Sequence, residues 1–210
     1  MTGLYIHIPF CLTKCPYCDF YSVKYGKGMA EEYKKAVIRN LKQYSDTDFD
    51  TVYFGGGTPI LLWREICEIL DNVSLADNAE ITLEANPCVC LEENLKELRV
   101  GGVNRISLGV QSLNDNELKA LGRRHNSQTA VKAIETAHRC GFENISADIM
   151  LATPLQTSES LRETVSMLGK LPVTHISAYM LKIEDNTPFA ERELPLPDED
   201  RFCEIYLDTV

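Results

Sequence analysis

Three cysteines lie close together near the N-terminus, in the segment Cys11-Leu-Thr-Lys-Cys15-Pro-Tyr-Cys18. An iron–sulfur cubane needs soft thiolate ligands on neighbouring irons, and a compact loop can supply them from one segment. Three protein ligands leave one iron of the cubane open, so an external molecule can bind there. The spacing therefore predicts a [4Fe–4S] cluster on Cys11, Cys15 and Cys18.

Zinc is the alternative metal for this loop. Structural zinc usually takes four ligands, arranged as two short-spaced pairs. The candidates for a second pair, Cys88 and Cys90, are separated by a single residue, which is poor spacing for zinc. Cys67 and Cys140 lie beside apolar helical stripes, and Cys203 lies in the last predicted helix. We expect structural roles for all five of these cysteines.

Short β-rich runs alternate with amphipathic helical runs along the chain. The predicted strands cover 3–9, 51–54, 80–84, 105–110, 144–150 and 174–181. The predicted helices cover 30–44, 61–73, 92–100, 115–121, 127–140, 158–171 and 198–210, the last with Phe202, Ile205, Tyr206 and Val210 on its apolar side. Six β–α repeats predict an α/β fold with a parallel sheet under helical cover. This alternation does not distinguish an open sheet from a barrel.

Polar and glycine residues stand at the ends of successive predicted strands. Gly55-Gly56-Gly57-Thr58-Pro59 follows the second strand, Glu84 ends the third, and Gln111 follows the fourth. Parallel α/β folds place their active sites at the carboxyl edge of the sheet. Successive glycines let the backbone approach a ligand closely. The pattern predicts a ligand site at this edge.

Two charged residues belong to the same prediction. Asp148 lies inside the apolar fifth strand, where a carboxylate is costly unless it is paired, so a functional role is favoured. Arg123 can pair bidentately with a carboxylate, whereas its neighbour Arg124 reads as a surface charge. His7 and His125 are single histidines, which are more often structural than metal ligands, and we assign neither to the site.

Composition restricts the class of protein. Hydrophobic residues make up 44% and charged residues 25%, as in a globular protein with a core, and the net charge of −10 argues against a nucleic-acid partner. The sequence contains no apolar run long enough for a membrane span and no signal-peptide pattern at its N-terminus. Eight cysteines without a leader favour a reducing compartment, and we expect the cytoplasm.

The motif CxxxCxxC directly after a first strand is the signature of the radical S-adenosylmethionine (radical SAM) superfamily. The longer string from Tyr5 to Phe20, YIHIPFCLTKCPYCDF, closely resembles the HemN/HemW group within it. The resemblance implies an incomplete (β/α)6 TIM-like barrel and S-adenosylmethionine as cofactor. It implies cofactor contacts from Tyr5, Tyr17, Gly56, Gly57, Thr58 and Glu84, and it is consistent with contacts from Gln111, Arg123 and Asp148.

The implied chemistry is reductive cleavage of S-adenosylmethionine. The cofactor binds the open iron, and an electron from the reduced cluster breaks the sulfonium C–S bond, leaving methionine and a 5′-deoxyadenosyl radical. This requires a reductant protein. The protein orients the reactants and excludes water and oxygen.

Two features favour the HemW branch of the group. HemN-like proteins carry another cysteine where this chain has Phe20, and they have an N-terminal extension that is almost absent here. HemW proteins are heme chaperones, so the resemblance implies heme or a porphyrin as ligand and a heme-acceptor protein as partner. The alternatives are an oxygen-independent coproporphyrinogen III dehydrogenase and, from another class, a non-catalytic cluster-based sensor.

The resemblance also divides the chain. We expect residues 1–183 to form the radical SAM core and residues 184–210, rich in Pro and acid, to form a linker and the start of a truncated C-terminal HemN-type domain. After Asp148 the family usually reads Gly-Leu-Pro, whereas this chain reads Ala152-Thr153-Pro154, so we expect the shape of that loop to differ.

Overall fold

The computed structural model describes residues 1–207, apart from the side chains of Glu199 and Phe202. Its centre is a six-stranded parallel sheet in the order β1-β4-β5-β6-β7-β8. The strands are β1 (Gly3–Ile8), β4 (Phe49–Gly56), β5 (Leu75–Ala85), β6 (Arg105–Gln111), β7 (Asn144–Leu151) and β8 (His175–Met180). Two short strands, β2 (Phe10–Cys11) and β3 (Val23–Lys24), pair separately at the ends of the cysteine loop.

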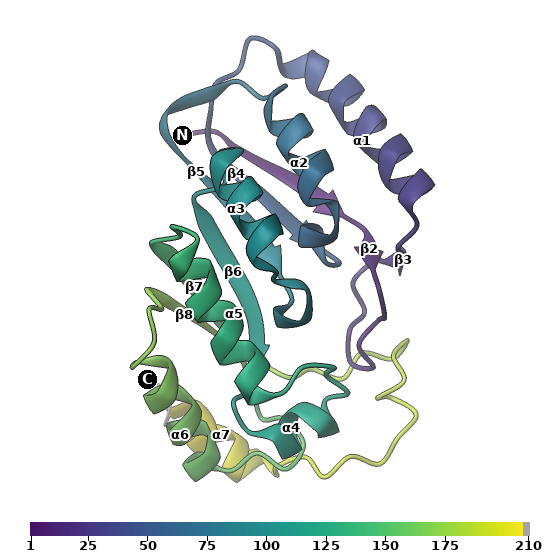
Figure 1. The fold of residues 1–210 in the computed structure, drawn as a ribbon. Helices are drawn as coiled ribbons and strands as arrows, with labels where there is room; N and C mark the ends of the chain where they lie inside the picture. The colour runs from purple at the N-terminus through teal and green to yellow at the C-terminus, as the bar shows by residue number, and fades with distance from the viewer. Residues whose placement is uncertain (208–210) are drawn as a thin grey trace.

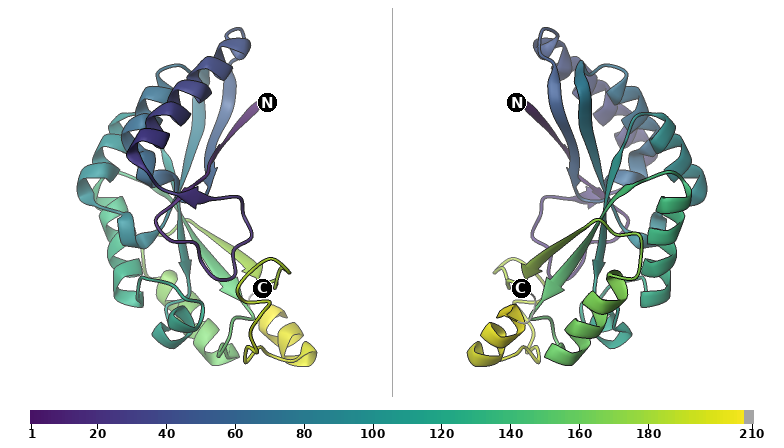
Figure 2. Two further views of the ribbon diagram at one scale, coloured as in Figure 1. Left: turned by 90° about the vertical axis from the view of Figure 1, so that its right-hand side faces the viewer. Right: turned by 90° about the vertical axis from the view of Figure 1, so that its left-hand side faces the viewer.

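The helices between consecutive strands cover one face of this sheet (Figures 1 and 2). They are α1 (Lys27–Leu41), α2 (Trp63–Leu70), α3 (Glu92–Val100), α4 (Asp115–Ala120), α5 (Ser127–Arg139) and α6 (Ser158–Leu168). Three short 3-10 helices, η1 (Lys42–Tyr44), η2 (Pro59–Leu62) and η3 (Pro87–Val89), join them to neighbouring elements. The predicted α/β alternation is therefore confirmed.

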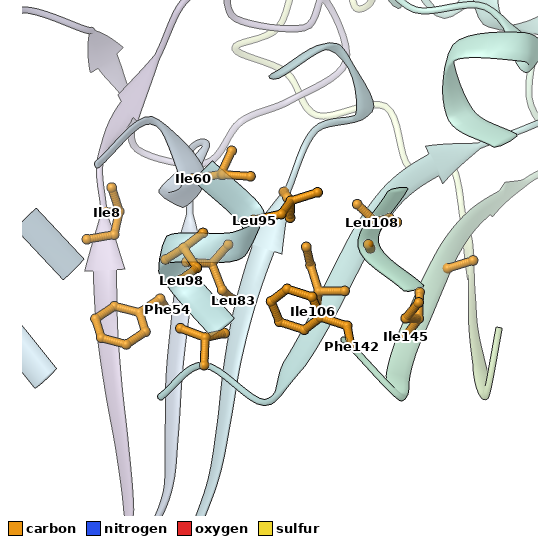
Figure 3. Packing of buried hydrophobic residues seen from close by; sticks show 14 of the residues in the cluster. Ile8, Phe54, Ile60, Leu83, Leu95, Leu98, Ile106, Leu108, Phe142 and Ile145 are labelled. Atoms are coloured by element: carbon orange, nitrogen blue, oxygen red, sulfur yellow. The ribbon is translucent and has the colours of Figure 1, made fainter. Parts of the chain in front are cut away.

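Period-two alternation in the strands separates an apolar face from a polar one. The apolar side chains, such as Phe54, Leu83 and Ile106, are fully buried against the helices and form one continuous core with Leu95 and Leu98 of α3 (Figure 3). The intervening side chains point to the other face, the concave side of the sheet that these helices leave uncovered (Figure 2). They are mostly polar or aromatic: Tyr5, His7, Tyr53, Glu84, Ser107, Asp148, Ser177 and Tyr179.

Strand β5 differs most from its prediction, because it starts at Leu75 and not at Glu80. Its first five residues, Leu-Ala-Asp-Asn-Ala, carry no alternating pattern of apolar and polar side chains. They pair with β4 at Phe49↔Leu75, the register then shifts before Thr51↔Glu80, and Asn78 adopts a φ of 61°. An irregular extension of this kind leaves no periodic signal in the sequence.

The segment after β8 folds back onto the cysteine loop. Phe189 is 1% exposed and packs in a small second core with Leu121 and Met150, against Tyr17. Its backbone N–H donates to the Pro16 carbonyl at 3.1 Å. The segment that the sequence suggests is a linker therefore makes specific contacts with the core.

The last helix, α7 (Glu199–Leu207), confirms the helix predicted there and lies against α6 (Figure 1). Ile205 is fully buried, as its place on the predicted apolar side requires, whereas Tyr206 is 53% exposed. Val210 and the side chain of Phe202, which were predicted for the same apolar side, lie outside the described residues. Among residues 1–207, no helix combines the length and the apolar character needed to cross a membrane.

Candidate functional site

The carboxyl edge of the sheet brings the predicted site residues together. The cysteine loop follows β1 and meets the glycine turn after β4, where Thr58 Oγ1 lies 3.7 Å from Cys11 Sγ. The same loop meets the segment after α4, where Arg123 Nη1 lies 3.4 Å from Cys15 Sγ. Residues more than a hundred positions apart thus converge on the cysteine loop.

The cysteine loop is closed by backbone hydrogen bonds at its base. Val23 N–H donates to the Pro9 carbonyl at 2.6 Å, and Tyr25 N–H donates to the Cys11 carbonyl at 2.9 Å. All three thiols are free and half-buried. Among residues 1–207, no three or more Cys, His, Asp or Glu side chains are grouped closely enough to hold a metal ion. Three thiols on one loop, with hydrogen-bond donors directed at two of their sulfurs, are a donor set that fits a cubane with an open iron.

The glycine turn packs against the backbone that precedes the cysteines. A Cβ on Gly57 would lie 2.7 Å from the carbonyl oxygen of Phe10, and a Cβ on Gly56 would lie 2.6 Å from the His7 ring. Gly56 also has a φ of 115°, which is in the region that favours glycine. The N–H of Thr58 donates to the Phe10 carbonyl at 2.8 Å. The turn therefore needs glycine in order to bring Thr58 beside Cys11.

Glu84 closes the same turn from the next strand. Its carboxylate accepts the Tyr53 hydroxyl at 2.8 Å and the Gly56 N–H at 3.0 Å. Burial raises its pKa, with the two hydrogen bonds opposing the shift and the Asp148 charge adding to it. Glu84 is thus fixed beside the turn and faces the concave side of the sheet.

Asp148 is the second carboxylate on this face. Its Oδ1 accepts the Ser107 hydroxyl of the neighbouring strand at 2.9 Å. Burial raises its pKa, and hydrogen bonds from Ser107 and Ser177 oppose the shift. The pairing predicted for a carboxylate inside an apolar strand is provided by these serines.

Arg123 links the end of β6 to the cysteine loop. Its Nη2 donates to the Gly109 carbonyl at 2.8 Å, and its Nη1 contacts both Cys15 Sγ at 3.4 Å and Tyr17 Oη at 3.1 Å. Its Nε is buried and has no hydrogen-bond partner within the described chain. A buried N–H without a partner is costly, so this donor fits the oxygen of a bound ligand. Arg124, by contrast, is exposed, as expected.

Gln111 and the two predicted tyrosines complete the site. Gln111 Oε1 accepts the Tyr179 hydroxyl at 2.7 Å. Tyr17 is half-buried against Arg123, and burial raises its pKa. Tyr5 is 58% exposed, stacks on Tyr53 with ring centroids 6.1 Å apart, and shares a hydrogen bond of 3.0 Å with His7 Nδ1. Tyr5 thus presents an accessible aromatic surface beside the glycine turn.

A family comparison matches this arrangement. The family model described as the radical SAM superfamily matches residues 5–168, which include the cysteine loop and the carboxyl ends of β1, β4, β5, β6 and β7. The chain belongs to the radical SAM superfamily.

Among curated proteins, the chain is similar to heme chaperones. The chain is 38% identical to the heme chaperone HemW of Haemophilus influenzae and 38% identical to that of Escherichia coli, in each case over 97% of this chain and 57% of the relative. It is 35% identical to the heme chaperone HemW of Bacillus subtilis, over 98% of this chain and 58% of the relative. The chain therefore spans somewhat more than half the length of these relatives.

Solved structures of other proteins share this fold. The coproporphyrinogen III oxidase HemN of Escherichia coli superposes with a TM-score of 0.86 at 24% identity, over 99% of this chain and 51% of that one. Methylornithine synthase (PylB) superposes with a TM-score of 0.70 at 13% identity, over 98% and 61%. The six parallel strands with their helices thus form the incomplete (β/α)6 barrel expected for this radical SAM chain.

Sequence reasoning missed the hydroxyls that hold the site side chains. Tyr53, Ser107 and Tyr179 each bond one site side chain, namely Glu84, Asp148 and Gln111 in that order. A signal was present, because period-two alternation places each of them on the concave face of its strand.

The histidines take structural places in this radical SAM chain. His7 Nε2 lies 3.0 Å from the Tyr21 carbonyl oxygen, and the buried His125 Nε2 lies 3.0 Å from the Val110 carbonyl oxygen. The other five cysteines are also free. Cys67 and Cys140 contact backbone carbonyls of α3 at 3.8 and 3.7 Å.

The loop with the departure from the family pattern has a defined shape. Ala152 adopts a φ of 56°, the left-handed region where the usual glycine is unstrained. Its N–H donates to Gln156 Oε1 at 2.6 Å, and Gln156 Nε2 donates to the Met150 carbonyl at 3.0 Å. These two bonds hold the loop although alanine replaces glycine.

Proposed function

We propose that this chain binds a [4Fe–4S] cluster through Cys11, Cys15 and Cys18 with S-adenosylmethionine beside it, as the core of a HemW-like heme chaperone. The observation that carries the proposal is the position of Arg123. Its guanidinium reaches Cys15 and leaves a buried Nε–H free for a ligand oxygen. A ligand that binds both the open iron and Arg123 needs a carboxylate near a metal-binding group, and the methionyl end of S-adenosylmethionine has both.

The remaining residues supply binding and orientation. Arg123 binds the carboxylate, and Gly56, Gly57 and Thr58 let the methionyl group lie against backbone. Glu84 accepts hydrogen bonds from polar groups of the ligand, as Tyr53 and Gly56 already donate to it. When bound, cluster and cofactor together supply one-electron cleavage of a carbon–sulfur bond.

The other side of the cofactor is bounded by the strands that follow. Gln111 and Asp148 offer an amide and a carboxylate toward the nucleoside end. Tyr5 on β1 and Tyr17 within the cysteine loop provide aromatic cover. Because these groups lie on four separate strands or loops, their positions depend on an intact sheet edge.

We infer a heme chaperone and not a porphyrinogen dehydrogenase. Curated relatives at 34–38% identity carry the name heme chaperone HemW. The resemblance to the HemN/HemW group also favours this branch, because Phe20 stands where HemN-like proteins are expected to carry a further cysteine. Because the chain spans somewhat more than half of these relatives, heme handling belongs to the longer protein. That protein requires a reductant protein, passes heme to an acceptor protein and works in the cytoplasm.

The test uses the full-length protein with its cluster reconstituted. We expect it to bind heme stoichiometrically, monitored by its Soret absorption, and to transfer heme to an apo-acceptor in a gel-based assay. We expect no decarboxylation of coproporphyrinogen III by product chromatography. Decarboxylation without heme transfer would favour the dehydrogenase. Cys18→Ala removes the cluster, and heme transfer that is unchanged in this variant would show that the chaperone activity does not need the cluster. The matched control is Cys88→Ala, because Cys88 is exposed and lies outside the loop.

A further inference from the structure

The end of β6 carries a strained turn at the site. Gln111 has a φ of 69°, and the Ser112 N–H donates across it to the Val110 carbonyl at 2.9 Å. The pairing of β6 with β7 shifts register between Gly109 and Gln111. A non-glycine residue at positive φ costs free energy and persists only where its surroundings hold it there.

Two side chains from the segment after α4 hold this turn. Arg123 Nη2 donates to the Gly109 carbonyl at 2.8 Å, and His125 Nε2 lies 3.0 Å from the Val110 carbonyl oxygen. Both carbonyls flank the register shift. The Val110 carbonyl therefore receives the Ser112 N–H and the imidazole together.

The protonation of His125 defines its role. Its side chain is 4% exposed, and burial together with the nearby Arg123 charge lowers its pKa to about 4. The hydrogen bond to Val110 and the Asp115 charge oppose this shift. The ring is neutral at pH 7, and because a carbonyl can only accept, the proton lies on Nε2. The buried Nδ1 has no partner within the described residues, so the bond to Val110 is the polar contact that fixes the ring.

We propose that His125 is a positioning residue that holds the backbone turn at Gln111. It thereby keeps the side-chain amide of Gln111 hydrogen-bonded to Tyr179 and near Arg123. The proposal rests on the proposed function, because Gln111 and Arg123 are assigned there to the cofactor. His125 itself touches neither thiols nor ligand. It acts through the Val110 carbonyl.

Three variants distinguish the loss of the hydrogen bond to the Val110 carbonyl from the loss of side-chain volume at position 125. His125→Gln can place an amide N–H where Nε2 stands, His125→Asn is too short to reach, and His125→Leu keeps apolar bulk without a donor. The control is His138→Leu, since His138 is exposed on α5. Hydrogen exchange of the Ser112 amide, measured on the full chain without cluster, reports the turn directly.

We expect Ser112 exchange in His125→Leu and His125→Asn to accelerate at least ~10-fold, the scale of one lost buried hydrogen bond, with parental exchange in His125→Gln and His138→Leu. In the reconstituted protein, the Kd for S-adenosylmethionine should rise about tenfold in the same two variants and stay within about twofold in the others. Equal behaviour of Gln and Leu variants in both measurements would overturn the proposal. If the parent itself does not bind S-adenosylmethionine, the proposed function fails, whereas the exchange data still decide the role of His125 in the turn.

Discussion

Mild acid should destabilise this chain through His125. The pKa of this imidazole is about 4 in the folded chain, whereas an unperturbed histidine titrates near 6.5. Between these values the unfolded chain binds a proton that the folded chain does not, so stability falls as the pH decreases through this window. From pH 7 to pH 5 the chain crosses about 1.5 pH units of the window at about 1.4 kcal/mol per unit, a loss of about 2 kcal/mol.

The assay is urea denaturation of the cluster-free chain at pH 7 and pH 5, compared with His125→Gln. Carboxylates such as Glu84 and Asp148 also titrate toward acid, but they are present in both proteins. The difference between the two pH-dependent losses therefore isolates His125. We expect the parent to lose about 2 kcal/mol more than the variant.

The control replaces an exposed imidazole by the same amide. His138→Gln should keep the pH dependence of the parent, because its ring is exposed. Equal losses in the parent and in His125→Gln would mean that His125 accepts a proton in the folded chain and does not cause the acid sensitivity.

Three further substitutions test the site and its supports. Gly57→Ala should lower the cluster content, measured by iron analysis, and weaken S-adenosylmethionine binding, measured by titration, because its Cβ would lie 2.7 Å from a backbone oxygen. The control is Gly28→Ala, whose Cβ would meet nothing within 4 Å and which should change neither quantity. Asp148→Asn should be more stable than the parent at pH 7, measured by urea denaturation. Burial raises the pKa of the Asp148 carboxyl, so its ionisation costs free energy in the folded chain once the pH exceeds the pKa of the unfolded chain. The variant should therefore lose its advantage below about pH 4, where the carboxyl is protonated in both states. Phe189→Ala should cost about 3 kcal/mol and expose residues 184–197 to proteolysis, whereas the 42%-exposed Leu196→Ala should cost little. An unchanged cleavage pattern in Phe189→Ala would show that the segment is held by other contacts.

The sequence predicts the sheet and the edge on which the site lies, because both follow from local patterns. Alternation in β1 and β6 marks the strands, and the polar residues that end them must meet once the strands are parallel. The partners of those residues depend on register, which a single sequence does not specify. Ser107 reaches Asp148 only because the two strands align Gly109 with Asp148.

The backbone conformation at the site could not be predicted from the sequence either. Nothing in the residue type of Gln111 indicates a positive φ, which is seen only with the carbonyl bonds around it. Phe189 likewise reads as one aromatic residue in a loop, whereas its burial requires contacts with Leu121 and Met150, far away in sequence. Local sequence patterns do not indicate packing between residues so far apart in the chain.

EPR of the chain after anaerobic reconstitution with iron and sulfide and reduction with dithionite tests the cluster assignment most directly. We expect a [4Fe–4S]⁺ signal that changes when S-adenosylmethionine is added. The signal should be lost in Cys15→Ser and retained in Cys88→Ser. A chain that forms no cluster, or one that holds zinc at Cys11, Cys15 and Cys18 instead, would show that the three cysteines do not hold a [4Fe–4S] cluster.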